Sequence, residues 1–207
     1  MENVKDIDGN SYKTVRIGDQ IWMAENLKVT QYRYGQAYIW NITGDDKFYE
    51  RDEGAFCNYN NIKETTLVDI YGRLYNWYAV NDKRGLAPRG WHVPTDEEWQ
   101  DLCDYLGDNA GGKLKTTGMI ENGSGLWHKP NIGATNESGF NALPGGIRGS
   151  YKAGCKNIGY DGYFWSSSDY RGGATTAWSR KLSCDNTEIT RSNHSKSAGY
   201  SVRCIRD

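Results

Sequence analysis

The sequence has few of the large apolar residues that fill most protein cores. Leu, Ile, Val and Phe together make up 34 of its 207 residues. A content this low is typical of a disordered chain when the net charge is high, but the net charge here is −1. The chain also holds 8 Trp and 15 Tyr, whose rings bury large areas while their polar atoms find partners. Because no Pro- or Ser-rich linker divides the chain, we expect one aromatic-rich globular domain over residues 1–207.

Further absences exclude classes of function. No apolar run approaches 18 residues, so we expect no transmembrane helix and no direct membrane insertion. The nearly balanced charge argues against a nucleic-acid partner, which requires a basic face. The opening residues Met1-Glu2-Asn3 lack the basic and apolar parts of a signal peptide. We therefore expect either a cytoplasmic protein or a chain that follows a removed leader.

Metal-binding and redox patterns are also missing. The five cysteines include no Cys-x-x-Cys pair, and the three histidines show no metal-ligand spacing. We therefore expect no metal and no cofactor, although a structural calcium ion in the loop 131–137 stays an alternative. An odd number of cysteines leaves at least one thiol free or paired with another molecule. In an oxidising compartment, Cys184–Cys204 and Cys57–Cys204 are both open as disulfides.

The clearest structural pattern is a capped helix at residues 95–106. Thr95 is a good N-cap, and Glu98 three residues later completes a capping box. Gly107 can end the helix with a positive φ. The apolar residues fall at i, i+3, i+4 and i+7, which is one helical face; they are Trp99, Leu102, Cys103 and Leu106.

The remaining pattern predicts an α+β domain. Helical spacing favours a second helix at residues 69–80, although Gly72 weakens it. Residues 33–64 read as a long irregular connection. Strands are expected at residues 4–7, 12–17, 20–23, 55–59, 140–143, 163–167, 176–182, 188–191 and 200–205. We expect both helices to pack on one mainly antiparallel sheet that includes the final strand, with the first and last strands paired.

Six stretches of the chain, in order, resemble the Fibrobacter succinogenes major paralogous domain family. They are Gly-Asp-Gln-Ile-Trp-Met-Ala-Glu-Asn-Leu at 18–27, Tyr-Gly-Arg-Leu-Tyr-Asn-Trp-Tyr-Ala-Val at 71–80, Gly-Trp-His-Val-Pro-Thr-Asp-Glu-Glu-Trp at 90–99, Asn-Glu-Ser-Gly-Phe-Asn-Ala-Leu-Pro-Gly-Gly at 136–146, Phe-Trp-Ser-Ser at 164–167 and Tyr-Ser-Val-Arg-Cys at 200–204. The resemblance covers nearly the whole chain.

The resemblance implies a C-type-lectin-like fold, shared with the formylglycine-generating, sulfatase-modifying enzymes and with the variable proteins of diversity-generating retroelements. It also implies a secreted or lipid-anchored protein of the bacterial cell surface. The reactive cysteine pair of the sulfatase-modifying enzymes is closely spaced late in the chain, whereas Cys184 and Cys204 are 20 residues apart. The calcium-dependent sugar site of lectins is not matched either, because Lys129 stands where an acidic residue is needed.

In the C-type-lectin-like fold, the last third of the chain carries the ligand-binding surface. Between residues 165 and 194 the sequence mixes aromatic, short polar and charged side chains, a composition typical of recognition surfaces. We therefore predict a ligand-binding surface on residues 167–176 and 185–194. Its predicted contacts are Asp169, Tyr170, Arg171, Trp178, Arg180, Glu188, Arg191, Asn193 and His194. The segment 33–64 is the alternative location.

These observations favour a non-enzymatic module that binds a glycan or an extracellular protein and has no catalytic residues. Three alternatives stay open: a diversified receptor-type variable protein, an oxidase of the formylglycine-generating kind, and a structural subunit of a surface assembly. The sequence does not fix the oligomeric state.

Overall fold

The computed structural model describes residues 2–35, 37–44, 52–61, 65–150, 153–171 and 173–207. Within these residues the protein is an α+β structure of short strands, four α-helices and long ordered loops. The strands form four sheets in this part of the chain, rather than the one sheet expected. Most strand pairs are antiparallel, and two are parallel: β11 with β9 and β5 with β6.

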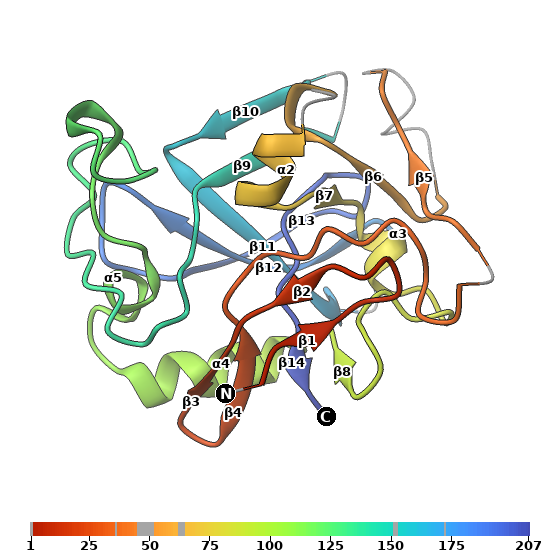
Figure 1. The fold of residues 1–207 in the computed structure, drawn as a ribbon, viewed down its shortest axis with the longest axis horizontal. Helices are drawn as coiled ribbons and strands as arrows, with labels where there is room; N and C mark the ends of the chain where they lie inside the picture. The colour runs from red at the N-terminus through yellow and green to blue at the C-terminus, as the bar shows by residue number, and fades with distance from the viewer. Residues whose placement is uncertain (1, 36, 45–51, 62–64, 151–152, 172) are drawn as a thin grey trace.

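The largest sheet has the strand order β10-β9-β11-β12-β13 and crosses the middle of Figure 1. Its strands are β9 (Gly145–Arg148), β10 (Cys155–Ile158), β11 (Asp161–Asp169), β12 (Thr176–Ser183) and β13 (Thr190–Ser195). The predicted strands 163–167 and 176–182 are confirmed within β11 and β12. The predicted strand 188–191 is displaced, since β13 begins at Thr190.

A second sheet joins the two ends of the chain in the order β3-β4-β14-β8. Its strands are β3 (Thr14–Ile17), β4 (Gln20–Met23), β8 (Trp91–His92) and β14 (Ile205–Arg206). The last strand β14 pairs with β4 rather than with the first strand, β1 (Val4–Lys5), which pairs with β2 (Ser11–Tyr12). Both chain ends lie at the lower edge of Figure 1. The segment 200–205 forms only isolated bridges before β14.

The third sheet, β5-β6-β7, consists of β5 (Trp40–Asn41), β6 (Ala55–Cys57) and β7 (Leu74–Tyr75). It orders part of the segment 33–64 that was expected to be irregular, and β6 confirms the strand expected near residue 55. Residues 36, 45–51 and 62–64 of that segment lie outside the described residues. The predicted strand 140–143 is wrong: Ala142 makes only an isolated bridge with Lys115, and the strand begins at Gly145.

Helix α4 (Asp96–Leu106) confirms the capped helix. The Glu98 N–H donates to Thr95 Oγ1 at 3.1 Å, and the Thr95 N–H donates to Glu98 Oε2 at 2.8 Å. The rings of Trp99 and Trp22 lie 4.8 Å apart, and Phe140 and Phe164 also contact Trp99. A second short helix, α5 (Ala110–Leu114), follows α4, and the 3₁₀ turns are Tyr59–Asn61 and Ile120–Asn122.

The helix predicted over residues 69–80 is wrong as a single element. The chain instead forms α2 (Thr65–Tyr71), the strand β7, and α3 (Trp77–Val80). Gly72 has a φ of 73°, and a Cβ there would come within 2.8 Å of Asn26 Cβ and the Leu27 carbonyl oxygen. This close approach requires glycine in a left-handed conformation. It breaks the helix, although the apolar residues on either side keep helical spacing.

Buried Arg203 joins several of the stretches that carry the family resemblance. Its Nε donates to Asn26 Oδ1 at 2.6 Å, and its Nη2 donates to the Asn141 carbonyl at 2.7 Å. Its Nη1 donates to the Met23 and Phe140 carbonyls. One side chain of the stretch 200–204 therefore binds the stretches 18–27 and 136–146. We call the six stretches that carry the resemblance the frame; outside it lie the segment 33–64 and the β12–β13 hairpin.

Candidate functional site

The hairpin formed by β12 and β13 carries most of the predicted contacts, but it divides them between its two faces. Side chains alternate along a strand, and Trp178 pairs with Asn193 while Arg180 pairs with Arg191. These four share the face that packs against α4. His194 pairs with Ala177, and therefore lies on the opposite face.

On the α4 face, two of the predicted arginines bind the same carboxylate. Arg180 is 1% exposed and donates to Asp96, the first residue of α4. Arg191 donates to Asp96 Oδ2 through Nη2 at 2.6 Å and through Nε at 2.9 Å. Burial raises the pKa of Asp96, but hydrogen bonds from Arg191 and Arg180 outweigh it and hold the pKa below its ordinary 3.8. Both arginines thus fasten the hairpin to α4.

The aromatic residues beside this ion pair form a small stack. The Arg191 guanidinium lies 3.4 Å from the centre of the Trp178 ring, and Tyr170 meets that ring edge-on at 4.8 Å. Arg171 lies over Tyr170 at 5.1 Å. Asn193 is exposed beside Trp178. The structure therefore brings these five predicted residues close to one another.

The other predicted residues lie apart from the stack. His194 is half-buried and bonds Ser179 Oγ through Nδ1 at 2.9 Å; burial, with the positive charge of Lys181, lowers its pKa. Asp169 pairs with the ammonium group of Lys196. Glu188 lies at the other end of the hairpin, in a hollow beside Asn109 and Ala110. The predicted set is thus not one continuous surface.

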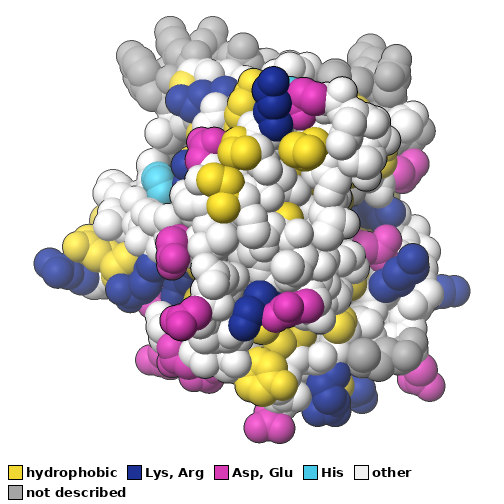
Figure 2. Space-filling model, turned by 90° about the vertical axis from the view of Figure 1, so that its left-hand side faces the viewer, with side chains coloured by type: hydrophobic (Ala, Val, Ile, Leu, Met, Phe, Trp, Pro, Cys, Tyr) yellow, Lys and Arg dark blue, Asp and Glu magenta, His cyan; other side chains and the backbone are white. Residues whose placement is uncertain are grey.

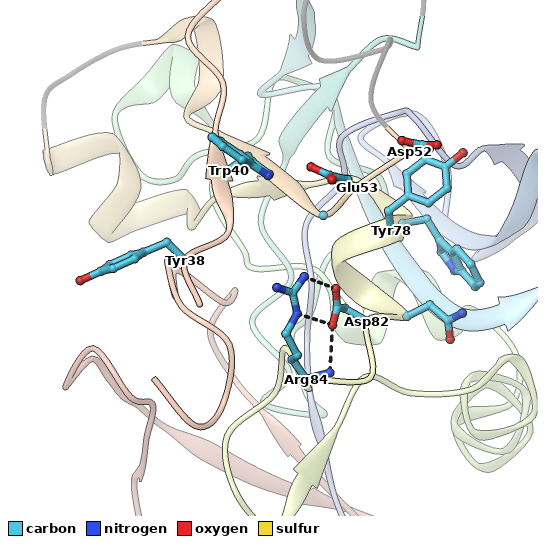
Figure 3. A pocket seen from close by; sticks show the side chains of 10 residues that line it. Tyr38, Trp40, Asp52, Glu53, Tyr78, Asp82 and Arg84 are labelled. Carbon is cyan, nitrogen blue, oxygen red and sulfur yellow. Dashed lines mark hydrogen bonds and ion pairs between the residues drawn. The ribbon is translucent and has the colours of Figure 1, made fainter. Parts of the chain in front are cut away.

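The structure also shows a cleft of about 510 Å³ that the sequence did not predict as the main site. We call it the aromatic cleft (Figure 3). It is lined by Tyr38, Trp40, Asp52, Glu53, Gly54, Trp77, Tyr78, Asn81, Asp82 and Arg84. Figure 3 shows Tyr38 and Trp40 on one side and Tyr78, Asp82 and Asp52 on the other. The residues come from β5, the approach to β6, α3 and the turn after α3.

Two of these aromatic side chains are unusually exposed. Tyr38 is 74% exposed and Trp40 is 53% exposed, whereas most of the large aromatic side chains in the described chain are buried. The same two residues also line a neighbouring hollow of about 560 Å³ with Thr30, Ile39, Asn41 and Phe56. The strip 38–40 is therefore a ridge between two hollows. Exposed aromatic side chains that adjoin one another beside a hollow are typical of a binding surface.

The opposite wall of the cleft is acidic. Asp82 accepts hydrogen bonds from Arg84 Nη2 at 2.6 Å and Nε at 2.8 Å, and this contact lowers the pKa of Asp82. Asp52 and Glu53 add two carboxyl groups beside Tyr78. Burial, together with Asp52, raises the pKa of Tyr78, so its hydroxyl stays protonated. The wall therefore places acidic side chains and a phenol donor beside the cleft.

The frame holds the base of the cleft in place. The Asn76 side chain donates to the Glu53 carbonyl at 2.8 Å and accepts from the Ala55 N–H at 2.9 Å. Trp77 Nε1 donates to the Ser166 carbonyl at 2.9 Å. A Cβ at Gly54 would overlap the hydroxyl of Tyr32, so only glycine fits there. These contacts give the cleft a pre-formed floor.

Sequence reasoning missed the aromatic cleft because its residues come from three separate segments. No motif links Trp40 with Asp82. One signal was present: residues 32–40 contain Tyr32, Tyr34, Tyr38 and Trp40 in a polar context. Such a concentration outside any periodic element indicates aromatic side chains that need not be core.

A metal centre has little support among the described residues. In that part of the chain no three His, Cys, Asp or Glu side chains form a group that could hold an ion. In the loop 131–137, Asn131 directs its amide to the Thr116 and Gly118 carbonyls, and Glu137 lies 3.5 Å from Lys113 Nζ.

The face that carries α5 mixes acidic and basic side chains (Figure 2). No described helix is long and apolar enough to cross a membrane.

Comparison with known proteins gives one match. The model of the Fibrobacter succinogenes major domain matches residues 15–206, which is nearly the whole chain. Searches of curated proteins and of solved structures return no match.

Proposed function

The chain belongs to the Fibrobacter succinogenes major domain family, and from this premise we propose that it is a non-enzymatic module that binds a glycan in the aromatic cleft. The observation that carries the proposal is a cleft that two exposed aromatic side chains, Tyr38 and Trp40, line together with acidic residues. The apolar C–H face of a sugar ring stacks on an aromatic ring, while sugar hydroxyls donate to carboxylates. The cleft offers both.

The charge of the cleft favours a neutral glycan. Asp52, Glu53 and Asp82 are acidic, and Arg84, the one basic residue among those lining the cleft, is already paired with Asp82. A uronic acid or a sulfated sugar would place like charges together, which disfavours binding. We therefore expect neutral oligosaccharides to bind and acidic ones to be rejected.

We further propose that the α+β architecture is the C-type-lectin-like fold and that the protein acts in the extracellular space or at the cell surface. The pairing of β14 with β4 near the chain ends and the long ordered loops support the fold. A surface location agrees with a ligand such as a glycan. An array of neutral and acidic glycans is the first experiment, because it identifies the ligand without assuming its structure.

The binding prediction concerns the two exposed aromatic residues. Tyr38→Ala and Trp40→Ala should each weaken binding of the best array glycan by about tenfold, as expected for central aromatic contacts. Isothermal titration calorimetry measures the change. Tyr160→Ala is the matched control, since Tyr160 is also an exposed aromatic residue (51%) but lies outside the cleft; it should bind as the wild type does.

The same titration decides between the cleft and the predicted hairpin surface. If ligand contacts lie on the hairpin, Tyr170→Ala should weaken binding by about 1 kcal/mol or more while Trp40→Ala does not. Arg191→Ala is less informative, because Arg191 also holds Asp96. Normal binding by both cleft variants would refute the cleft as the site.

A further inference from the structure

Two of the five cysteines lie close together in the small third core cluster. Cys57 in β6 is fully buried there with Ile42, Ala55 and Leu74, and Cys155 in β10 packs against the same cluster. The two thiols are close enough for each to shift the pKa of the other. Cys155 is only partly buried, whereas Cys57 is fully buried.

The other cysteines are kept apart by the fold. Cys204 lies in the core cluster around Trp165, whereas Cys184 lies in the cluster around Trp99. Neither Cys184–Cys204 nor Cys57–Cys204 is bonded in the structure. Cys103 is half-buried on α4. All five thiols are free in the structure.

From the packing of these two side chains we infer that Cys57 and Cys155 are a modification site, where a small-molecule disulfide oxidises them to a bridge between β6 and β10. The inference does not depend on glycan binding. The bridge would tie the β5-β6-β7 sheet, which carries Trp40, to the five-stranded sheet. Neither strand pairs with the other through the backbone, so the bond would be a new connection.

The surroundings of Cys155 favour the first step. Hydrogen bonds from Cys57 and from the backbone N–H of Asn60, together with the positive charge of Arg148, outweigh burial and lower the pKa of Cys155 to about 6. The pKa of Cys57 is raised, mainly by its hydrogen bond to Cys155 and secondly by burial. The lowered pKa favours the thiolate form of Cys155, and a thiolate is the nucleophile in disulfide exchange.

The reaction is a balanced exchange. Cys155 sulfur attacks one sulfur of oxidised glutathione, whose S–S bond breaks, and the first glutathione leaves and takes up a proton. Cys57 then loses its proton to solvent and attacks Cys155 sulfur. The bond between Cys155 and the second glutathione breaks, and this glutathione leaves as a thiol. Two protein thiols lose two electrons, and oxidised glutathione gains them.

The test uses the whole chain treated with oxidised glutathione. The wild type should lose two of its five thiols, carry no glutathione, and yield a Cys57–Cys155 linked peptide by mass spectrometry. Its melting temperature should rise on oxidation, because the bridge restricts the unfolded chain. Cys103→Ser is the matched control and should form the same bridge.

Two variants keep the inference falsifiable. Cys57→Ser should retain glutathione on Cys155, since no second thiol displaces it. If that variant does not fold, Cys155→Ser carries the test and should keep its four thiols. The inference is overturned if the wild type keeps all five thiols, if its linked peptide contains another cysteine, or if it retains a stable glutathione adduct.

Discussion

At the scale of single residues, buried polar side chains hold distant parts of the chain together. Asn76 fixes the base of the cleft, and Arg203 binds carbonyl groups of β4 and of the loop at residues 140–141. Lys115, which is fully buried, donates to three backbone carbonyls at 2.8–2.9 Å. These residues show no periodic pattern, so their roles were not predicted from the sequence.

Replacing Arg203 by Lys should lower the free energy of unfolding by about 3–5 kcal/mol. The planar guanidinium reaches Asn26, Met23, Phe140 and Asn141 together, and a single ammonium group leaves some of these buried acceptors unpaired. Urea denaturation measures the difference. Arg206→Lys, on the exposed neighbouring residue, should be close to wild type, and an equal loss there would show that the frame does not depend on Arg203.

His92 should make stability depend on pH. Its Nε2 lies 2.8 Å from Glu98 Oε1, and its Nδ1 lies 2.7 Å from Asp207 Oδ1. The hydrogen bond to Glu98, together with Asp207, raises the pKa of His92 above 6.5 despite burial. The pKa of His92 is higher in the folded protein than in the unfolded chain. The stabilisation that protonated His92 gives to the folded protein is therefore complete below about pH 6.5, and it is lost as pH rises through the folded-state pKa.

The expected size of this effect is small, about 1 kcal/mol or less, because the ring is more than a third exposed. Thermal unfolding of wild type and His92→Asn across pH 5.5–9 measures it, a range of about three units around the ordinary value. The difference between the two proteins should shrink toward the alkaline end. A difference that stays constant would mean that the charge on His92 does not contribute.

At the scale of elements, local signals succeed and long-range packing decides the rest. The helix α4 was predicted because its cap and its apolar face lie within twelve residues. The helix predicted at 69–80 failed because contact of Gly72 with Asn26 and Leu27, 45 residues earlier in the chain, sets the break. Of the two hairpin strands, β12 was predicted closely and β13 was predicted two residues too early. The sequence did not show which side chains of the hairpin would be bound internally.

The apolar face of α4 gives a prediction at this scale. Trp99→Ala should cost about 3–5 kcal/mol, because the ring is 1% exposed and packs against Trp22, Phe140 and Phe164. The urea midpoint is the measurement. Gln100→Ala changes the exposed side of the same helix and should shift stability by about 0.5 kcal/mol or less. Equal midpoints for the two variants would show that the ring is not core.

At the scale of the whole molecule, we expect folding to need no metal ion. The aromatic clusters supply the core, and the acidic residue of the loop 131–137 pairs with a lysine. Melting temperatures with and without a chelator should agree within error. A large decrease on chelation would instead identify that loop as a calcium site.

The family, the α+β class and the general order of elements could be predicted from the sequence, since each depends on short sequence motifs or on hydrophobic periodicity. The aromatic cleft was not, because it arises only when Tyr38, Trp40, Tyr78 and Asp82 meet in space. Likewise, the contact of Cys57 with Cys155 spans nearly one hundred residues. Sites built from separate segments need the fold before they can be recognised.

The exposure of Trp40 gives the protein an optical reporter. All eight tryptophans lie in the described residues, and Trp40 is the one that is exposed; Trp178 is covered by Arg191 and Tyr170. A neutral dissolved collisional quencher, which the acidic cleft does not repel, acts chiefly on indoles that meet solvent, so it should reduce fluorescence mainly from Trp40. A sugar stacked on that ring would shield it from the quencher. Occupancy of the cleft could then be followed in unmodified protein as a decrease in the quenching of Trp40 fluorescence.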